Sequence, residues 1–268
     1  MITLKNISKK YGERNALNNL SAVFYEGDFI TVIGGNGAGK STLLNVIDSS
    51  IAPDSGELFI DLDKGSTNKK TIVGRVYQDI NSGTSPGMTI KENFAMSFLR
   101  GKNISLRKGI TNETVKRIID ILKLVQNDLL RKILVRDVDK YKQYFNKLDF
   151  VNRLDVKMES LSGGERQFLS VLMVLMTDID LLLLDEHVAS LDPIMGEIIM
   201  LLTAYIVEQK KYSTIMVTHN IEYAIQFGNR IIMLDQGEIV LDLSNEDKAK
   251  LTVKYIIDKY GFTKTKLH

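Results

Sequence analysis

A glycine-rich segment followed by lysine and serine is the clearest chemical signal in the 268-residue sequence. Residues 34–41 read GGNGAGKS, which fits the phosphate-loop pattern, with a β-branched run before them and a helical pattern after them. Glycines let the backbone curl so that successive N–H groups point at phosphate oxygens. Lys40 can then reach the β- and γ-phosphates, and the Ser41 hydroxyl can bind Mg²⁺. The residues expected to contact a nucleotide are Gly34, Asn36, Gly37, Ala38, Gly39, Lys40, Ser41 and Thr42.

Two neighbouring carboxylates follow the apolar run Leu181–Leu184. In open parallel sheets, ligands bind where the strands end, and adjacent strand residues point to opposite sides. We therefore expect Asp185 to hold Mg²⁺, often through water, and Glu186 to orient and polarise an attacking water. An acidic strand end or a helix N-cap is the alternative, and the upstream phosphate loop disfavours it.

A serine and two glycines begin a third segment of interest. Ser162 and Glu165 have the spacing of a capping box, which predicts a helix N-terminus there. The capping box does not explain Gly163 and Gly164, because glycine in a helix costs up to about 1 kcal/mol relative to alanine. We expect that something approaches this backbone closely, and a helix N-terminus with free N–H groups attracts anions.

Short apolar runs and helical patterns predict how these residues are positioned. The runs predicted as strands are Ile2–Ile7, Phe29–Ile33, Leu58–Ile60, Ile72–Val73, Leu181–Leu184, Thr214–Val217 and Ile231–Leu234. Between residues 85 and 161 the pattern is mostly helical, which predicts a sheet domain that carries an inserted helical subdomain. The charged, tyrosine-rich residues 130–154 indicate a solvated helical face or, alternatively, a surface that binds a partner. Residues 246–260 are expected to form one amphipathic helix.

Composition excludes several classes of protein. The 35 Lys and Arg residues nearly cancel the 33 Asp and Glu residues, so no strong field favours nucleic acid. The chain has no cysteine and therefore no disulfide framework. The N-terminus lacks the pattern of a signal peptide. The most apolar stretches, Phe168–Met176 and Leu181–Leu184, are far shorter than the roughly 20 residues of a membrane helix.

Taken together, the motifs resemble the nucleotide-binding subunit of ABC transporters over nearly the whole chain. Further matches support the resemblance. Tyr11, in KKYG, matches the aromatic residue that stacks on adenine, and Gln78, in RVYQD, matches the glutamine that touches Mg²⁺ and the water. His219, in VTHN, matches the switch histidine at the γ-phosphate, and residues 190–192 match the segment after the acidic pair.

The resemblance implies an α/β fold of the P-loop NTPase class, with a mostly parallel core sheet, an N-terminal antiparallel β subdomain and an inserted helical subdomain. It implies a nucleotide-binding core over residues 1–84 and 162–243, a helical subdomain over 85–161 and a helical tail over 244–268. ATP and Mg²⁺ would be the cofactors. The residues implied in catalysis are Lys40, Gln78, Glu186 and His219, and those implied at the metal are Ser41, Gln78 and Asp185.

The resemblance also implies partners. Two copies would form a head-to-tail dimer in which Ser162, Gly163 and Gly164 of one copy cover the ATP of the other. The chain would bind membrane permease subunits at the cytoplasmic face of a bacterial membrane. An extracellular solute-binding protein would act through the permease. Nucleic acid is not an expected partner. Residues 83–93 and Asp185–His187 resemble an importer group associated with tryptophan, tyrosine or related solutes. A soluble ATPase of a protein-assembly complex, such as iron–sulfur cluster assembly, and an exporter or division-type ATPase are the alternatives.

Three positions depart from the family's commonest residues. His187 stands where many members carry proline, Gly35 where proline or serine is frequent, and Glu165 where glutamine is common. None of these changes removes a catalytic group. An ordinary packed or exposed histidine is the expectation for His187, with a pH-sensitive contact at the dimer seam as the alternative.

Overall fold

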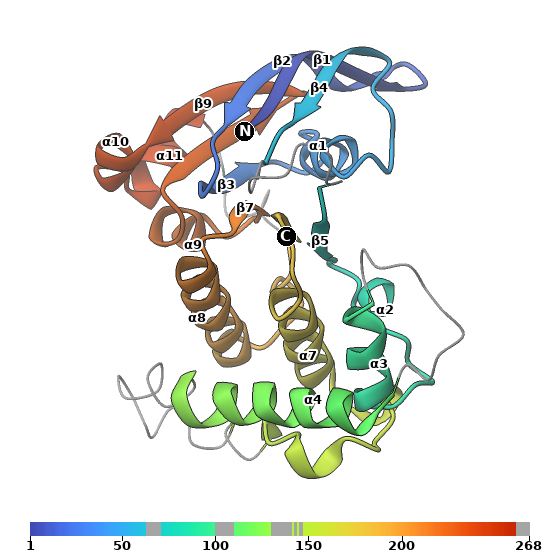
Figure 1. Ribbon diagram of the computed structural model, residues 1–268. Helices are drawn as coiled ribbons and strands as arrows, with labels where there is room; N and C mark the ends of the chain where they lie inside the picture. Colours follow the sequence, from blue (N-terminus) through green and yellow to red (C-terminus); the bar gives the residue numbers. More distant parts are fainter. Residues whose placement is uncertain (63–70, 100–109, 130–140, 142–143, 145–146, 261–268) are drawn as a thin grey trace. The chain divides into compact units, whose positions relative to one another are not determined.

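The computed structural model describes residues 1–62, 71–99, 110–129, 141, 144 and 147–260. The chain divides into two compact units: Met1–Arg75, Ile179–Ala189 and Lys210–His268 form the first, and Val76–Asp178 and Ser190–Gln209 form the second (Figure 1). Within the described ranges, no helix combines the length and the apolar character that a membrane span needs. The predicted boundaries of the core, the helical subdomain and the tail stay a prediction.

The N-terminal residues of the first unit form a three-stranded antiparallel sheet. Strand β1 (Ile2–Tyr11) lies between β2 (Arg14–Phe24) and β4 (Ser55–Ile60). Gly12, in the turn from β1 to β2, has a φ of 58°, a conformation that glycine adopts without a steric penalty. The antiparallel subdomain expected from the resemblance is confirmed, and β1 extends beyond the predicted run Ile2–Ile7.

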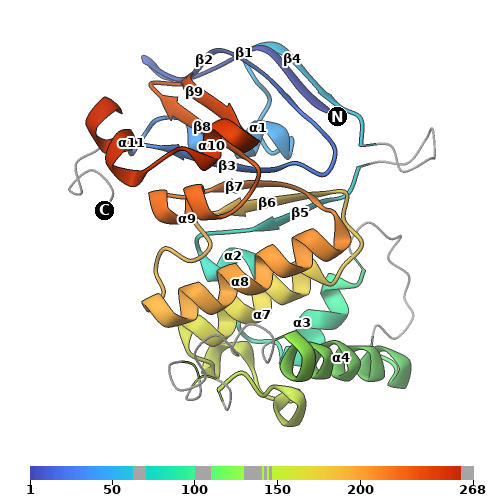
Figure 2. The same ribbon diagram turned by 90° about the vertical axis from the view of Figure 1, so that its left-hand side faces the viewer.

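A six-stranded sheet follows, in the order β5-β6-β7-β3-β8-β9. Its strands are β3 (Phe29–Gly34), β5 (Val73–Val76), β6 (Leu181–Asp185), β7 (Ser213–Val217), β8 (Arg230–Asp235) and β9 (Glu238–Ser244). Strands β6, β7, β3 and β8 pair in parallel, and β9 pairs antiparallel with β8 (Figure 2). The mostly parallel sheet is therefore confirmed.

The register of the parallel strands brings their carboxyl ends together. Asp185 of β6 pairs with Val217 of β7, and Val217 also pairs with Val32 of β3, two residues before the strand ends at Gly34. The strands therefore end at the same edge of the sheet. In open α/β sheets, ligands bind at the edge where the carboxyl ends of the strands lie. The segments after β3, β6 and β7 are those in which the sequence places the phosphate loop, Glu186 and His219.

Helix α1 (Lys40–Ile47) joins the two sheets into one core. Its side chains Leu43, Leu44, Val46 and Ile47 are buried with apolar residues from both sheets, including Leu4 of β1. Burial of this kind contributes about 25 cal/mol per Å² of apolar surface, so α1 is anchored along its length. The phosphate loop that precedes α1 is consequently held between a fixed strand and a fixed helix.

A second, smaller cluster brings α9 (Ile221–Gln226) and α11 (Val253–Tyr260) together with β8. The single helix predicted over residues 246–260 is wrong, because the tail forms α10 (Asn245–Ala249) and α11 with a break between them. Thr252 explains the break: its hydroxyl accepts a hydrogen bond from the Tyr255 N–H at 3.1 Å. A hydroxyl that accepts from the first turn in this way favours the start of a new helix at Thr252.

The second unit is mainly helical, as the residue pattern predicts. Its regular elements in the described residues are α2 (Ile80–Gly83), α3 (Ile90–Ser97), α4 (Asn112–Leu124), the π-helix η1 (Val125–Leu129), the 3-10 turns η2 (Val151–Arg153) and η3 (Met158–Ser160), α7 (Gly163–Leu175) and α8 (Pro193–Lys210). Helices α7 and α8 run side by side in both views (Figures 1 and 2). A solvated face or a partner surface was expected for residues 130–154, of which residues 130–140, 142–143 and 145–146 lie outside the described residues.

Candidate functional site

The glycine-rich segment forms a tight loop between β3 and α1. Gly37 and Gly39 have φ values of 78° and 104°, in the left-handed region where side chains are strained. A Cβ atom on Gly39 would lie 2.2 Å from the Ala16 carbonyl oxygen, so only glycine fits there. The Gly39 carbonyl accepts the first helical hydrogen bond, from the Leu43 N–H at 2.8 Å. Free N–H groups at this helix N-terminus therefore face the loop, as a phosphate site requires.

Lys40 is buried inside the loop. Its Nζ atom donates to the Gly34 carbonyl oxygen at 3.0 Å and to the Gly35 carbonyl oxygen at 3.1 Å. Burial lowers the pKa of the ammonium group, while the charges of Glu186 and Asp185 act in the opposite direction. Two neutral carbonyls are weak partners for a buried cation compared with an anionic phosphate, so Lys40 is poised to bind one.

A cavity of about 290 Å³ opens over this loop, entirely within the first unit. It is lined by Tyr11, Arg14, Ala16, Asn36, Gly37, Gly39, Lys40, Ser41, Thr42, Glu186 and His219. The predicted residues Gly34 and Asp185 each contact a lining residue, since Gly34 accepts from Lys40 and Asp185 from Ser41. Residues distant in the sequence thus meet at one cavity beside the strand ends.

Glu186 and His219 come into direct contact at this cavity. Nε2 of His219 lies 2.6 Å from Oε1 of Glu186, and both side chains are mostly buried. Glu186 has a φ of 47°, an uncommon conformation for a residue with a side chain, and its N–H donates to the Val217 carbonyl at 3.0 Å. Strained backbone of this kind is found often at functional sites, where it fixes the direction of a side chain.

Asp185 is held by an arginine that the sequence did not single out. Nη2 of Arg75 donates to Oδ2 of Asp185 at 2.6 Å, and Nη1 donates to Oδ2 of Asp48 at 2.5 Å and to Oδ1 of Asn45 at 2.7 Å. Burial by itself would lower the pKa of Arg75, but the bonds to Asp48 and Asp185 outweigh it and raise that pKa. An arginine inside a short apolar strand was the available signal, because a buried arginine needs carboxylate partners.

The remaining oxygen of Asp185 faces the phosphate loop. Its Oδ1 atom accepts from the Ser41 hydroxyl at 3.5 Å, a separation at which both oxygens could bind one small cation. Carboxylate and hydroxyl oxygens are the hard donors that Mg²⁺ takes, with phosphate oxygens and water completing its shell. Within the described residues, no three His, Cys, Asp or Glu side chains gather into a metal site. The hydroxyl of Ser41 and the Oδ1 atom of Asp185 are thus donors that fit a magnesium ion.

Ala38, which was also predicted to contact the nucleotide, is buried and lines the neighbouring cavity of about 740 Å³ instead. The four remaining predicted site residues lie in the second unit. Gln78 is exposed, after β5 and before α2. Ser162 precedes α7, and both bonds of the predicted capping box are present, with the Ser162 N–H donating to Oε2 of Glu165 at 2.9 Å. A Cβ atom on Gly164 would lie 3.0 Å from Cγ of Met195, so a neighbouring side chain does approach this backbone.

Two of the three residues that depart from the family's commonest pattern, His187 and Glu165, are buried. His187 is buried, and burial lowers its pKa from 6.5 to about 3, so the imidazole is neutral near pH 7. His187 is therefore a packed histidine within this chain, and its contact at a dimer seam stays a prediction. Glu165 bonds to Arg153 at 2.7 Å; burial acts to raise its pKa, but the bonds from Arg153 and Ser162 prevail and lower it.

Comparisons with known proteins agree with this geometry. A family model described as ABC transporter matches residues 17–189. A tyrosine transport ATP-binding protein of Clostridioides difficile is 39% identical over 98% of this chain and 99% of its own length. A choline transport ATP-binding protein of Bacillus subtilis is 31% identical, over 90% of this chain and 56% of its own length. Among solved structures, the dimeric ATP-binding cassette MJ0796 in a post-hydrolysis state with ADP and Pi is 29% identical, with a TM-score of 0.68 and coverage of 91% of this chain and 98% of that chain.

Proposed function

This chain belongs to the ABC transporter family, and from that premise we propose that it energises a bacterial importer of a small, amino-acid-like solute. ATP hydrolysis follows from the family and from the likeness to a solved ATP-binding cassette. The solute class is carried by one observation, the 39% identity to a protein named for tyrosine transport over nearly the full length of both chains.

The residues of the cavity would have different roles in ATP binding and hydrolysis. Lys40 would exchange the Gly34 and Gly35 carbonyls for the β- and γ-phosphates, and Tyr11 would stack on the adenine. Glu186 would orient and polarise the attacking water. His219, already held on Glu186, would stabilise charge on the transferred phosphoryl group. Catalysis would thus rest on positioning and charge neutralisation.

Ser41, Asp185 and Gln78 would hold Mg²⁺. When bound, the ion supplies positive charge to the β- and γ-phosphates. Arg75 would keep one oxygen of Asp185 occupied and leave the other directed at Ser41. Asp185 would therefore present a single, fixed oxygen to the ion.

Two copies of the chain would act together. The solved cassette MJ0796 is described as dimeric with ADP and Pi, which supports a second copy here. In the head-to-tail arrangement, Ser162, Gly163 and Gly164 of one copy would cover the ATP bound in the cavity of the other. The free N–H groups at the start of α7 suit an anionic ligand. ATP would then hold the two copies together, and hydrolysis would let them separate.

Membrane subunits would carry the solute. We assign residues 1–84 and 162–243 to the nucleotide-binding core, residues 85–161 to a helical subdomain and residues 244–268 to a tail. A helix of the permease would bind near residues 78–93. The chain would lie at the cytoplasmic face of the membrane, and a solute-binding protein would deliver the solute to the permease from outside.

The test is a pull-down of the tagged Glu186→Gln chain from its native cells, in mild detergent with ATP, followed by mass spectrometry. A multi-span membrane protein together with a solute-binding lipoprotein is the expected result. A multi-span protein without any solute-binding protein would favour an exporter or division-type ATPase. A soluble assembly complex without a membrane protein would overturn the transport role in favour of an iron–sulfur-type assembly ATPase.

A further inference from the structure

Arg14 stands at the mouth of the nucleotide cavity, on the hairpin that also carries Tyr11. In the antiparallel pairing of β1 with β2, Tyr11 and Arg14 lie opposite each other. Side chains of residues directly opposite in such a pair project from the same face, with Cβ atoms about 4.5 to 5.5 Å apart. Both residues line the cavity. Arg14 therefore lies beside the residue that would stack on the base.

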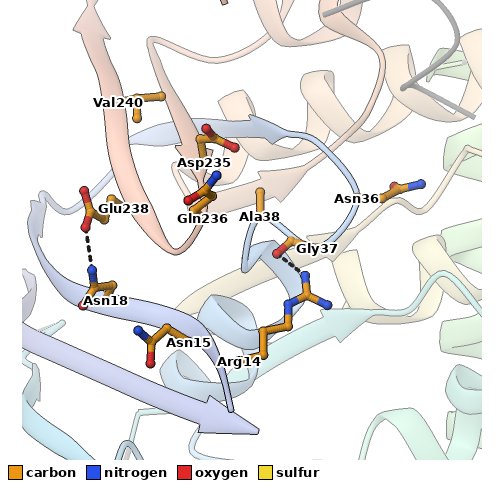
Figure 3. A pocket seen from close by; sticks show the side chains of 10 residues that line it. All are labelled: Arg14, Asn15, Asn18, Asn36, Gly37, Ala38, Asp235, Gln236, Glu238 and Val240. Carbon is orange, nitrogen blue, oxygen red and sulfur yellow. Dashed lines mark hydrogen bonds between the residues drawn. The ribbon is translucent and has the colours of Figure 1, made fainter. Parts of the chain in front are cut away.

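The guanidinium group of Arg14 rests on the phosphate loop itself. Its Nη2 atom donates to the Gly37 carbonyl oxygen (Figure 3). The approach is so close that a Cβ atom on Gly37 would lie 1.7 Å from Nη2. Arg14 thus spans the distance between the base side of the cavity, marked by Tyr11, and the apex of the loop.

The positive charge of Arg14 has no carboxylate partner among the described residues. Within the same residues, the one hydrogen-bond acceptor recorded for its guanidinium is the neutral Gly37 carbonyl. Arg14 also borders a neighbouring cavity of about 740 Å³, in which the carboxylate of Glu238 already accepts from Asn18 (Figure 3). A guanidinium has five donors in a fork that matches phosphate oxygens.

We propose that Arg14 is a nucleotide-binding residue that leaves the Gly37 carbonyl for the phosphates of a nucleotide whose base lies on Tyr11. The proposal rests on nucleotide binding in this cavity. Arg14 and Lys40 are the arginine and the lysine that line this cavity, and both donate to carbonyls of the phosphate loop. An anionic ligand offers each of them a stronger, charge-assisted hydrogen bond.

A purely structural role makes a different prediction. If Arg14 only fixed the loop through Gly37, its loss would lower the melting temperature of the nucleotide-free protein and weaken binding without changing the dependence of binding on salt. A direct contact with phosphate adds a salt-sensitive Coulombic contribution to the binding free energy. The dependence of the dissociation constant on KCl concentration therefore separates the two roles.

The experiment titrates the protein with ADP and with an ATP analogue that has an imido β–γ bridge, at several KCl concentrations, by calorimetry. We expect Arg14→Gln to weaken both ligands by on the order of tenfold, as the loss of one charge-assisted hydrogen bond would, and to flatten the salt dependence. Arg14→Lys should keep the salt dependence of the wild type. Lys10→Gln is the matched control, because Lys10 is an exposed cation of the same hairpin that lines neither cavity.

Wild-type affinity in Arg14→Gln would overturn the proposal, and so would weaker binding with an unchanged salt dependence and a lower melting temperature. Lys40→Ala in the same titration distinguishes a failure of the Arg14 proposal from a failure of the nucleotide-site assignment. If Lys40→Ala loses affinity while Arg14→Gln does not, nucleotide binding in the cavity stands and the role of Arg14 falls. If neither variant loses affinity, the nucleotide site itself is misassigned.

Discussion

Nε2 of His219 lies 2.6 Å from Oε1 of Glu186 at the edge of the parallel sheet. The two residues follow neighbouring strands, β7 and β6, and the Glu186 N–H bonds to Val217 at the end of β7. Strand pairing therefore brings them together, and the left-handed backbone of Glu186 directs its carboxylate at the imidazole. The carboxylate and the imidazole face the cavity as one unit, so a change in either side chain should affect the other.

Glu186→Gln should retain ATP binding and nearly abolish turnover. The amide keeps the size of the carboxylate and can still accept from His219, but it cannot polarise water as a base does. Loss of a general base lowers the rate by about a hundredfold to ten-thousandfold. Phosphate release measures turnover, and titration with ATP in the same preparation measures binding. Turnover near that of the wild type would refute the assigned role of Glu186.

Lys40→Ala should lose nucleotide affinity. The substitution removes the buried cation that is held on the Gly34 and Gly35 carbonyls and that would bind the β- and γ-phosphates. Titration of a fluorescent ATP analogue gives the dissociation constant directly. A melting curve without nucleotide serves as the control for folding, and an unchanged dissociation constant would contradict the phosphate-loop assignment.

Arg75→Met should destabilise the protein strongly. The substitution leaves the buried carboxylates of Asp48 and Asp185 without their shared cation. Removing one partner of a buried ion pair costs about 3 to 5 kcal/mol. Guanidinium denaturation measures the free energy of unfolding. Lys9→Met, which breaks the pair with the half-exposed Asp54, is the control and should change little, because water screens that pair. Equal effects of the two substitutions would be evidence against the role of Arg75.

Lys248 should make stability depend on pH in alkaline solution. Its ammonium is buried and donates to the Phe227 and Gly228 carbonyls that end α9, and burial lowers its pKa from 10.5 to about 8. Between these two values the unfolded chain holds more protons than the folded one, so the free energy of unfolding rises as the pH rises from 8 to 10.5. The stabilisation is lost as the pH falls from 10.5 to 8, and below 8 this group no longer changes the stability with pH.

Denaturation of the wild type and of Lys248→Met over this pH range checks the direction. The wild type should gain stability relative to Lys248→Met as the pH rises. Lys250→Met changes an exposed lysine two residues away and should follow the wild type throughout. A constant difference in stability between the wild type and Lys248→Met would show that Lys248 does not titrate in this window.

The local chemistry of this protein could be predicted from patterns along the chain. The glycines at 37 and 39, the capping box of Ser162 and Glu165 and the apolar run before Asp185 are local patterns, and local patterns depend on backbone conformation and spacing along the chain. The parallel core sheet also followed from short apolar runs that suit strands covered on both faces. The tail was mispredicted as one helix because the role of Thr252 as a cap was not recognised.

The residues that meet from distant parts of the chain are known from the fold and not from the sequence patterns. Periodicity and spacing do not specify strand order, and the order β6-β7-β3 is what brings Glu186, His219 and Lys40 to one cavity. Arg75 and Arg14 were missed for the same reason. Their partners, Asp48 and Asp185 for one and the Gly37 carbonyl for the other, are distant in sequence. A charge acquires its role from its neighbours in space, and those neighbours exist only once the chain has folded.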